Sequence, residues 1–232
     1  MKTVLLKLSG ELLAPPQFAR IDGSLVRTIA QHIKQLRTSH HVNIVIGGGN
    51  FFRGCKEGKQ LGLAQPTADA AGMLATVMNG LIVHDLFKQE GLESIVLNAY
   101  AIPGVVGQVN QEIIDNALAT KTMIIFTGGT GNPYFSTDTA AVLRALQTRA
   151  TMLWKASNID HVYDADPKQN KNARPLKQIS YTEVLAQKLA VMDLPAIALA
   201  QEHKITIKVF SIFQPNALLC CAHDPDFGST IQ

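Results

Sequence analysis

The strongest constraint on the fold of this chain is a regular alternation of short apolar runs with longer segments of helical periodicity. Runs typical of buried strands occupy residues 3–8, 42–47, 94–99, 122–128 and 151–157. Segments with apolar residues at helical spacing occupy residues 24–37, 69–88, 109–120 and 137–150. Strands that alternate with helices through short connections favour a parallel sheet covered by helices on both faces. We therefore expect an α/β fold, a three-layer αβα sandwich with a mostly parallel central sheet.

The pattern loosens after residue 160. Residues 164–180 are polar and contain two prolines, which predicts a surface loop. Helices are expected near 181–189 and 194–203, and strands near 205–210 and 228–231. The chain has 232 residues, 47% of them hydrophobic, and shows no linker, repeat or low-complexity tract. Such a chain can bury one large core, so we expect a single domain over residues 1–232.

Charge and composition exclude several classes of protein. A formal net charge of +3 without a basic cluster does not suggest a nucleic-acid-binding protein. Lys7 interrupts the apolar N-terminal run after four residues, which argues against a signal peptide, and no stretch reaches the ~18 apolar residues of a membrane span. Three cysteines at positions 55, 220 and 221 give no disulfide framework and no metal-ligand spacing. We expect a cytoplasmic protein without a dedicated metal site.

Unusual residues follow four of the predicted strands. The first strand runs into Lys7-Leu8-Ser9-Gly10, the second into IGGGNFFRG (46–54), the fourth into GGTGNPYFSTDTAA (128–141), and the fifth carries Lys155. Ligands of open α/β sheets bind at the carboxyl ends of the strands. Glycine-rich loops let backbone N–H groups approach an anion closely, and a following helix adds its positive end. Two such loops near Lys7, Arg53 and Lys155 predict a phosphate-binding site.

The motifs of the common phosphate-binding machineries are absent from this sequence. No G-x-x-x-x-G-K-[ST] occurs, so the chain is not a P-loop enzyme, and no G-x-G-x-x-G opens the first helix. The protein-kinase set of H-R-D followed by D-F-G is also missing, because no H-R-D occurs and a D-F-G stands alone at residues 226–228. The phosphates must therefore be bound in another way.

A set of segments in fixed order resembles the bacterial uridylate kinases, a family of the amino-acid kinase superfamily. These segments are KLSGELL, VIGGGNFFRG, DAAGMLATVMNGL, GGTGNPYFSTDTAA and DHVYDADP, followed by VMDLPAIALA and the final GSTI. The resemblance runs from residue 3 to about residue 231. It implies the amino-acid kinase fold and the transfer of the γ-phosphoryl group of MgATP to UMP, giving ADP and UDP, in pyrimidine nucleotide biosynthesis.

The resemblance implies three catalytic residues, Lys7, Asp138 and Lys155. Phosphoryl transfer asks mainly for charge neutralisation and in-line positioning. Both lysines would stabilise the developing charge on the transferred group. Asp138 would orient them by ion pairing and would also support magnesium. Asp138 also begins a predicted helix, where a carboxylate is favoured by the helix dipole. Mg²⁺ is expected to arrive with ATP, with no dedicated cage of protein ligands.

The same resemblance divides the other site residues between the two nucleotides. The residues expected around ATP are Lys7, Leu8, Ser9, Gly10, Gly49, Arg53, Ser157, Tyr163 and Asp166. The residues expected around UMP are Gly48, Asp69, Thr130, Gly131, Asn132, Pro133, Tyr134, Phe135, Ser136 and Thr137. Within these sets, Arg53 would grip phosphate, Asp69 would accept from the ribose hydroxyls, and Tyr163 would lie against the base. The local alternatives are ordinary capping by Asp69 and Thr137 and a strand aromatic at Tyr163.

Some positions depart from the family pattern. His161 stands where glycine is common in the nucleotide loop, and Ser157 stands where threonine is often found. A ring at His161 must fit beside ATP, and its titration would make ATP affinity depend on pH. Asp193 matches an acidic position of the family, and we interpret it as structural.

Two alternatives and the assembly remain to be tested. The chain could be a kinase of the same superfamily that acts on a carboxylate, although TGNPYFSTD looks like the uridylate version of the acceptor loop. It could also be a non-catalytic nucleotide-binding or storage protein, which would be expected to lack one of the charged partners. The resemblance implies a homohexamer built as a trimer of dimers, with GTP and UTP as possible effectors. Residues 69–88 are apolar on more than one face, which suits a core or an interface.

Overall fold

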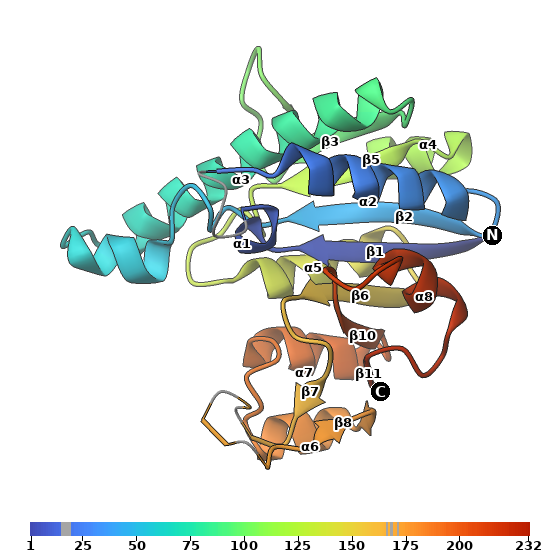
Figure 1. Cartoon of the computed structure of the whole chain (residues 1–232). Helices are drawn as coiled ribbons and strands as arrows, with labels where there is room; N and C mark the ends of the chain where they lie inside the picture. The colour runs from blue at the N-terminus through green and yellow to red at the C-terminus, as the bar shows by residue number, and fades with distance from the viewer. Residues whose placement is uncertain (15–19, 166, 168, 171) are drawn as a thin grey trace.

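The computed structural model describes residues 1–14, 20–165, 167, 169–170 and 172–232, and shows one sheet between two layers of helices (Figure 1). Its strands are β1 Lys2–Leu8, β2 His40–Ile46, β3 Ser94–Asn98, β4 Gly107–Gln108, β5 Met123–Thr127, β6 Met152–Ser157, β7 Val162–Tyr163, β8 Pro175–Leu176, β9 Gln178–Ile179, β10 Thr206–Ser211 and β11 Ser229–Ile231. Its helices are α1 Gly10–Leu13, α2 Gly23–Leu36, the π-helix η1 Gly54–Gly58, α3 Gln65–Gln89, α4 Gln111–Thr120, α5 Thr137–Gln147, α6 Tyr181–Ala186, α7 Leu194–Glu202 and α8 Ala217–His223.

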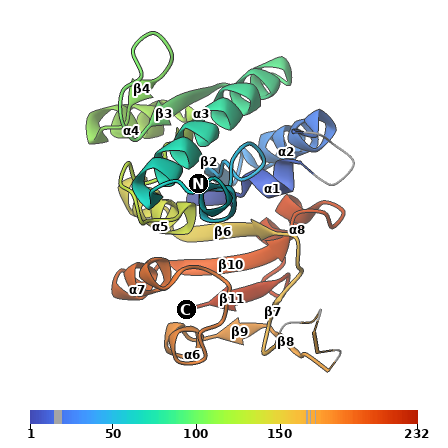
Figure 2. The same cartoon turned by 90° about the vertical axis from the view of Figure 1, so that its left-hand side faces the viewer.

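The large sheet has the strand order β4-β3-β5-β2-β1-β6-β10-β11-β9 across the described residues. Its neighbouring strands pair in parallel, except that β11 runs antiparallel to β10. β7 and β8 form a separate antiparallel pair beside the sheet (Figure 2). The mostly parallel sheet predicted from the sequence is confirmed.

Each face of the sheet has its own core. Val4, Leu6 and Leu8 of β1 pack with residues of α2, α3 and α8, whereas Leu5 packs with residues of α4, α5, α6 and α7. Figure 2 shows the two layers of helices on opposite sides of the strands. The three-layer αβα arrangement is therefore confirmed, and it follows from the alternation of side chains along each strand.

Helix α3 is long and apolar, and part of its surface remains exposed. Its 25 residues include an 18-residue window of mean hydropathy 1.4, of which 39% is buried. By length and composition this helix could cross a membrane, contrary to the estimate from the sequence. This is weak evidence, because core helices of soluble proteins pass the same criterion. Here Val83 and Phe87 of α3 lie in the core, against the face that α2 also covers.

The sequence predicted most of the long elements and missed several short ones. The stretch 164–180, predicted as a surface loop, contains β8 and β9, and β9 pairs with β11 at the edge of the large sheet. Helix α8 between β10 and β11 was also missed. These elements are two to seven residues long, too short for a periodic pattern to emerge.

Candidate active site

The two predicted catalytic lysines lie side by side at the carboxyl ends of adjacent strands. Lys7 of β1 is directly opposite Lys155 of β6 in the parallel register. Their neighbours Leu5 and Leu153 belong to the core under α5, so alternation places both lysines on that face of the sheet. The exposed fractions of their side chains are 8% and 13%, which excludes an interpretation as snorkelling surface cations.

Asp138 joins the two lysines. Its Oδ1 lies 2.9 Å from Lys7 Nζ, and its Oδ2 accepts a hydrogen bond of 2.7 Å from Lys155 Nζ. The ion pairs predicted for Asp138 are thus present. Helix α5 begins here, and its N-cap is Ser136, whose hydroxyl accepts from the Asp138 N–H at 2.9 Å. The alternative of Thr137 as the N-cap is therefore wrong, because Thr137 is already the first residue of the helix.

The charges of this cluster perturb one another. Burial alone would raise the pKa of Asp138, but the ammonium groups of Lys7 and Lys155 hold that pKa below its usual value. Burial lowers the pKa of Lys155, and Lys7 adds to this, while Asp138 opposes it. Because the two ammonium groups together offset the burial cost of the carboxylate, Asp138 stays ionised at neutral pH.

Asp193 forms hydrogen bonds with two helices near this cluster. It is the N-cap of α7, where its Oδ1 accepts from the Ala196 N–H at 3.3 Å. The hydroxyl of Thr139, in the first turn of α5, donates to both Asp193 oxygens at 3.1 and 2.9 Å. Asp193 therefore ties α7 to the start of α5, as the structural interpretation predicted.

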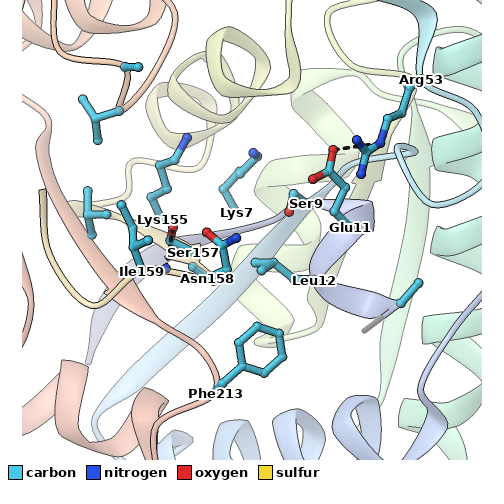
Figure 3. A pocket seen from close by; sticks show the side chains of 15 residues that line it. Lys7, Ser9, Glu11, Leu12, Arg53, Lys155, Ser157, Asn158, Ile159 and Phe213 are labelled. Carbon is cyan, nitrogen blue, oxygen red and sulfur yellow. Dashed lines mark hydrogen bonds and ion pairs between the residues drawn. The ribbon is translucent and has the colours of Figure 1, made fainter. Parts of the chain in front are cut away.

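A cleft of 710 Å³ opens beside the lysines, and we call it the Lys155 cleft. Figure 3 shows Lys7, Lys155 and Arg53 toward one part of it and Phe213 well away from them. It is lined by Lys7, Ser9, Glu11, Leu12, Ala14, Arg53, Lys155, Ala156, Ser157, Asn158, Ile159, Ala190, Val191, Val209 and Phe213. A cationic end and an apolar end suit a ligand with phosphates at one end and an apolar group at the other.

A second pocket of 440 Å³, the Asp69 pocket, shares Glu11 and Arg53 with the Lys155 cleft. It is lined by Glu11, Gly48, Gly49, Phe52, Arg53, Gly54, Lys56, Ala68, Asp69, Gly72, Met73, Thr76, Gly129, Phe135, Ser136 and Thr137. Because two residues line both spaces, the two pockets meet at Arg53. Two ligands could therefore be bound end to end.

The glycines of the strand-end loops are required by close backbone contacts. A Cβ on Gly48 would lie 2.7 Å from the carbonyl oxygen of Gly72 and 2.8 Å from Ala75 Cβ. Gly128 has φ +74°, a conformation that residues with a side chain rarely adopt. Its N–H donates to Thr76 Oγ1 at 2.6 Å, which fixes the loop against α3.

The predicted UMP loop is anchored by Asp69. The N–H of Tyr134, a residue with φ +71°, donates to Asp69 Oδ2 at 2.8 Å. Asp69 lies inside α3, which begins at Gln65, so the alternative that Asp69 caps this helix is wrong. Phe135, Ser136 and Thr137 line the Asp69 pocket. The lining does not include the other residues predicted for UMP in this loop, which are Thr130, Gly131, Asn132, Pro133 and Tyr134.

The residues predicted to bind ATP do not all line the same pocket. Lys7, Ser9, Arg53 and Ser157 line the Lys155 cleft, whereas Gly49 lines the Asp69 pocket. Leu8 and Gly10 are buried, so only their backbone could meet a ligand. Asp166 lies outside the described residues.

Tyr163 lines a third pocket of 440 Å³, which shares Ile159, Ala190 and Val191 with the Lys155 cleft. Its hydroxyl donates to Asp160 Oδ1 at 2.8 Å, and this bond raises the pKa of Tyr163. His161 Nδ1 lies 3.3 Å from Asp160 Oδ2, and the His161 and Tyr163 rings meet edge to face at 6.4 Å. His161 therefore contacts the predicted base-side tyrosine directly.

Sequence reasoning missed Glu11. Its Oε1 lies 3.1 Å from Arg53 Nε, where the two pockets meet (Figure 3). Arg53 Nε also donates to the Gly49 carbonyl at 3.3 Å. Glu11 stood within the quoted KLSGELL segment, but a single glutamate at a helix start is more often a dipole partner.

Sequence reasoning also missed the amide pair of Asn50 and Asn79. Asn79 donates to the Gly47 carbonyl at 2.6 Å and to Asn50 Oδ1 at 2.7 Å. No local pattern could have paired two amides on separate elements.

The comparisons with known proteins agree with this geometry. The family model described as the amino acid kinase family matches residues 2–211, so the chain belongs to the amino acid kinase family. The fold, with paired lysines at the carboxyl edge of the sheet, is thus that of a family of phosphoryl-transfer enzymes.

Within that family, the chain belongs with the uridylate kinases. It is 40% identical to a uridylate kinase of Pseudomonas syringae over 232 residues, covering 100% of this chain and 94% of the relative. It is 39% identical to a uridylate kinase of Haemophilus influenzae over 231 residues, covering 99% and 97%. Crystal structures of UMP kinases from Ureaplasma parvum and Bacillus anthracis each superpose with a TM-score of 0.94, at 34% and 29% identity. They cover 100% of this chain and 98% and 96% of their own.

Proposed function

We propose that this protein is a UMP kinase that transfers the γ-phosphoryl group of MgATP to UMP, giving ADP and UDP, in pyrimidine nucleotide biosynthesis. The observation that carries the proposal is the Lys7–Asp138–Lys155 cluster beside the junction of two pockets. The full-length similarity to proteins named uridylate kinase selects UMP as the acceptor, over the carboxylates of other amino acid kinases.

The two nucleotides are assigned by the character of the pockets. ATP takes the Lys155 cleft, with its phosphates at Lys7, Lys155 and Ser9 and its base toward the apolar side. UMP takes the Asp69 pocket, with its phosphate toward Arg53. Asp69 uses Oδ2 for the Tyr134 N–H, which leaves Oδ1 for a ribose hydroxyl. The γ-phosphate and the acceptor phosphate then meet at Arg53, where in-line transfer requires them.

Catalysis by this chain rests on charge and not on a general base. The second pKa of a phosphate monoester is ~6, so the attacking oxygen of UMP is already deprotonated at neutral pH. Asp138 has both oxygens beside ammonium groups and a lowered pKa, so it orients Lys7 and Lys155 and takes no proton. The ammonium groups stabilise negative charge on the transferred group, and their burial strengthens this attraction.

The residues of this site are compatible with a metal ion that arrives bound to the ATP phosphates. Among the described residues, no group of three or more histidine, cysteine, aspartate and glutamate side chains could hold a metal. Asp138 has one oxygen that accepts from Lys155 and the other 2.9 Å from the Lys7 ammonium group, whereas one oxygen of Glu11 is engaged by Arg53. Glu11, which lines both pockets, is the residue that would face the ion or its water. When bound, Mg²⁺ would neutralise charge on the ATP phosphates.

The assembly proposed for this chain is a homohexamer built from dimers, acting in the cytoplasm, with residues 1–232 as one domain. Exposed apolar side chains on α3 support self-association: Leu74 is 49% exposed, Met78 44%, Leu81 36% and Ile82 39%. Such a surface is costly to leave in water. Regulation by GTP or UTP remains a proposal from resemblance.

The test is a coupled assay of ADP formation from MgATP with UMP, CMP, dTMP or no acceptor. Turnover that depends on UMP supports the proposal. Turnover with acetylglutamate, glutamate or aspartate in place of UMP would move the chain to the carboxylate kinases. ATP binding without turnover on either class of acceptor would favour the storage alternative. Lys155→Met, which removes one ammonium group from the cluster, should lower kcat at least tenfold.

A further inference from the structure

A buried arginine behind the acceptor loop has no role in the mechanism described so far. Arg144 lies on α5, and only 4% of its surface is exposed. No carboxylate among the described residues lies within ion-pair distance of it. Burying a cation without a counter-ion is costly, so its retention needs a reason.

The guanidinium is held in one place by neutral partners. Its Nη1 donates to Gln147 Oε1 at 2.5 Å and its Nη2 to the carbonyl oxygen of Gly129 at 3.4 Å. Its Cζ lies 5.6 Å from the centre of the Phe126 ring, a cation–π distance. Its Nε is buried without a hydrogen-bond partner in the described part of the chain.

The contact with Gly129 helps to hold the direction of one peptide unit in the acceptor loop, within a turn that the Gly131 N–H closes by donating to the Gly128 carbonyl at 2.9 Å. Gly129 lines the Asp69 pocket and has φ +58°. In a trans peptide the C=O and the next N–H point in opposite directions. With the Gly129 carbonyl directed at Arg144, the Thr130 N–H faces the other way. That N–H donates to no backbone or side-chain acceptor in the described residues.

We propose that Arg144 is a positioning residue for the acceptor nucleotide: it holds the Gly129–Thr130 peptide so that the Thr130 N–H is free for the ligand. The inference rests on the proposed function for the identity of that acceptor.

The experiment compares Arg144→Met, Arg144→Lys and the control Arg149→Met. Arg149 lies just beyond α5 and pairs at 2.8 Å with Asp115, but its side chain is 69% exposed. Dissociation constants for UMP and for ATP are measured separately by calorimetry, with thermal unfolding alongside. Arg144→Met should weaken UMP binding about 2- to 10-fold, the range for one ordinary hydrogen bond from the Thr130 N–H, and change ATP binding less than about twofold. Arg144→Lys should fall between, because lysine keeps the charge but lacks the planar fork. Arg149→Met should match the parent.

A second measurement does not depend on UMP. In the ligand-free protein, NMR amide shifts and hydrogen exchange of Gly129, Thr130 and Gly131 should change in both Arg144 variants and not in Arg149→Met. Unchanged amides together with unchanged UMP affinity would overturn the proposal, as would equal losses for UMP and ATP. If Arg144→Met fails to fold while Arg144→Lys behaves as the parent in both measurements, Arg144 serves the fold alone and the proposal is wrong. Failure of the parent to bind UMP would count against the proposed function, while the amide measurement would still decide the loop's positioning.

Discussion

Replacing Asp138 with asparagine should leave two buried lysines without their counter-charge. The ammonium groups now lie 2.9 and 2.7 Å from the carboxylate, and the exposed fractions of the three side chains are 8%, 13% and 14%. Removing one partner of a buried ion pair costs about 3–5 kcal/mol. We expect Asp138→Asn to lower the free energy of unfolding at pH 7 by an amount in that range. The matched control is Asp115→Asn, whose pair with Arg149 is exposed and should cost about 0–1 kcal/mol.

The loss should depend on pH in a defined direction. Burial already lowers the pKa of Lys155, and Asp138 opposes that shift. Without Asp138 the pKa of Lys155 falls further, so the folded variant sheds this proton at a lower pH than the unfolded chain does. The free energy of unfolding of the variant should therefore rise with pH up to the ordinary lysine pKa. The difference in unfolding free energy between the parent and the variant should become smaller over this range. The difference in unfolding free energy should also become smaller toward acid pH. The lowered pKa of Asp138 stabilises the parent at neutral pH, and this contribution is lost as the pH falls through that lowered pKa.

The assay is urea unfolding of the parent, Asp138→Asn and Asp115→Asn between pH 3 and pH 10, which extends below the ordinary aspartate pKa of 3.8, with kcat measured on the folded fraction. A loss below about 1 kcal/mol at pH 7, or a gap independent of pH, would refute the argument that these ions offset one another's burial.

Three further changes test other parts of the site. Gly48→Ala should lower the free energy of unfolding by about 1–3 kcal/mol and weaken UMP binding, because the new Cβ would lie 2.7 Å from the Gly72 carbonyl oxygen. An unfolding free energy in urea equal to that of the parent would contradict this. Arg53→Lys should raise the KM values for both nucleotides in steady-state kinetics, because Arg53 lines both pockets. Glu11→Gln should raise them less, because the Glu11–Arg53 ion pair is about half exposed. An effect of Arg53→Lys on one nucleotide alone would place Arg53 in a single pocket. His161→Gly should raise the KM for ATP in steady-state kinetics, because it removes the contacts of His161 with Asp160 and Tyr163; an unchanged KM would exclude a role for the His161 ring.

The sequence predicted the parallel sheet and its long helices because periodicity reports burial directly. Parallel strands such as Ile44–Ile46 and Ile124–Phe126 are buried on both faces, and their apolar runs show it. Lys7 and Lys155 could be recognised in the sequence because a lysine is unusual within the apolar run of a buried strand.

What the sequence could not predict depends on contacts between distant elements. The Glu11–Arg53 pair joins residues 42 positions apart, and the Arg144–Gly129 contact depends on where α5 lies against its own preceding loop. The assignment of Gly48 and Gly49 to separate nucleotides came from resemblance, and the structure places both in the lining of one pocket. Backbone direction within a glycine loop is set by tertiary packing and leaves no pattern in the residue types.

The pairing of β1 with β6 has a consequence for biosynthesis. Lys7 is made near the start of the chain, and its partner strand follows almost 150 residues later. Until β6 emerges from the ribosome, β1 has β2 on one side and an open, apolar edge on the other. Exposed strand edges of this kind are prone to pair with other chains. Nascent chains that stall before residue 152 should therefore be the species that most needs protection by chaperones, and none of them can contain a complete phosphoryl-transfer site.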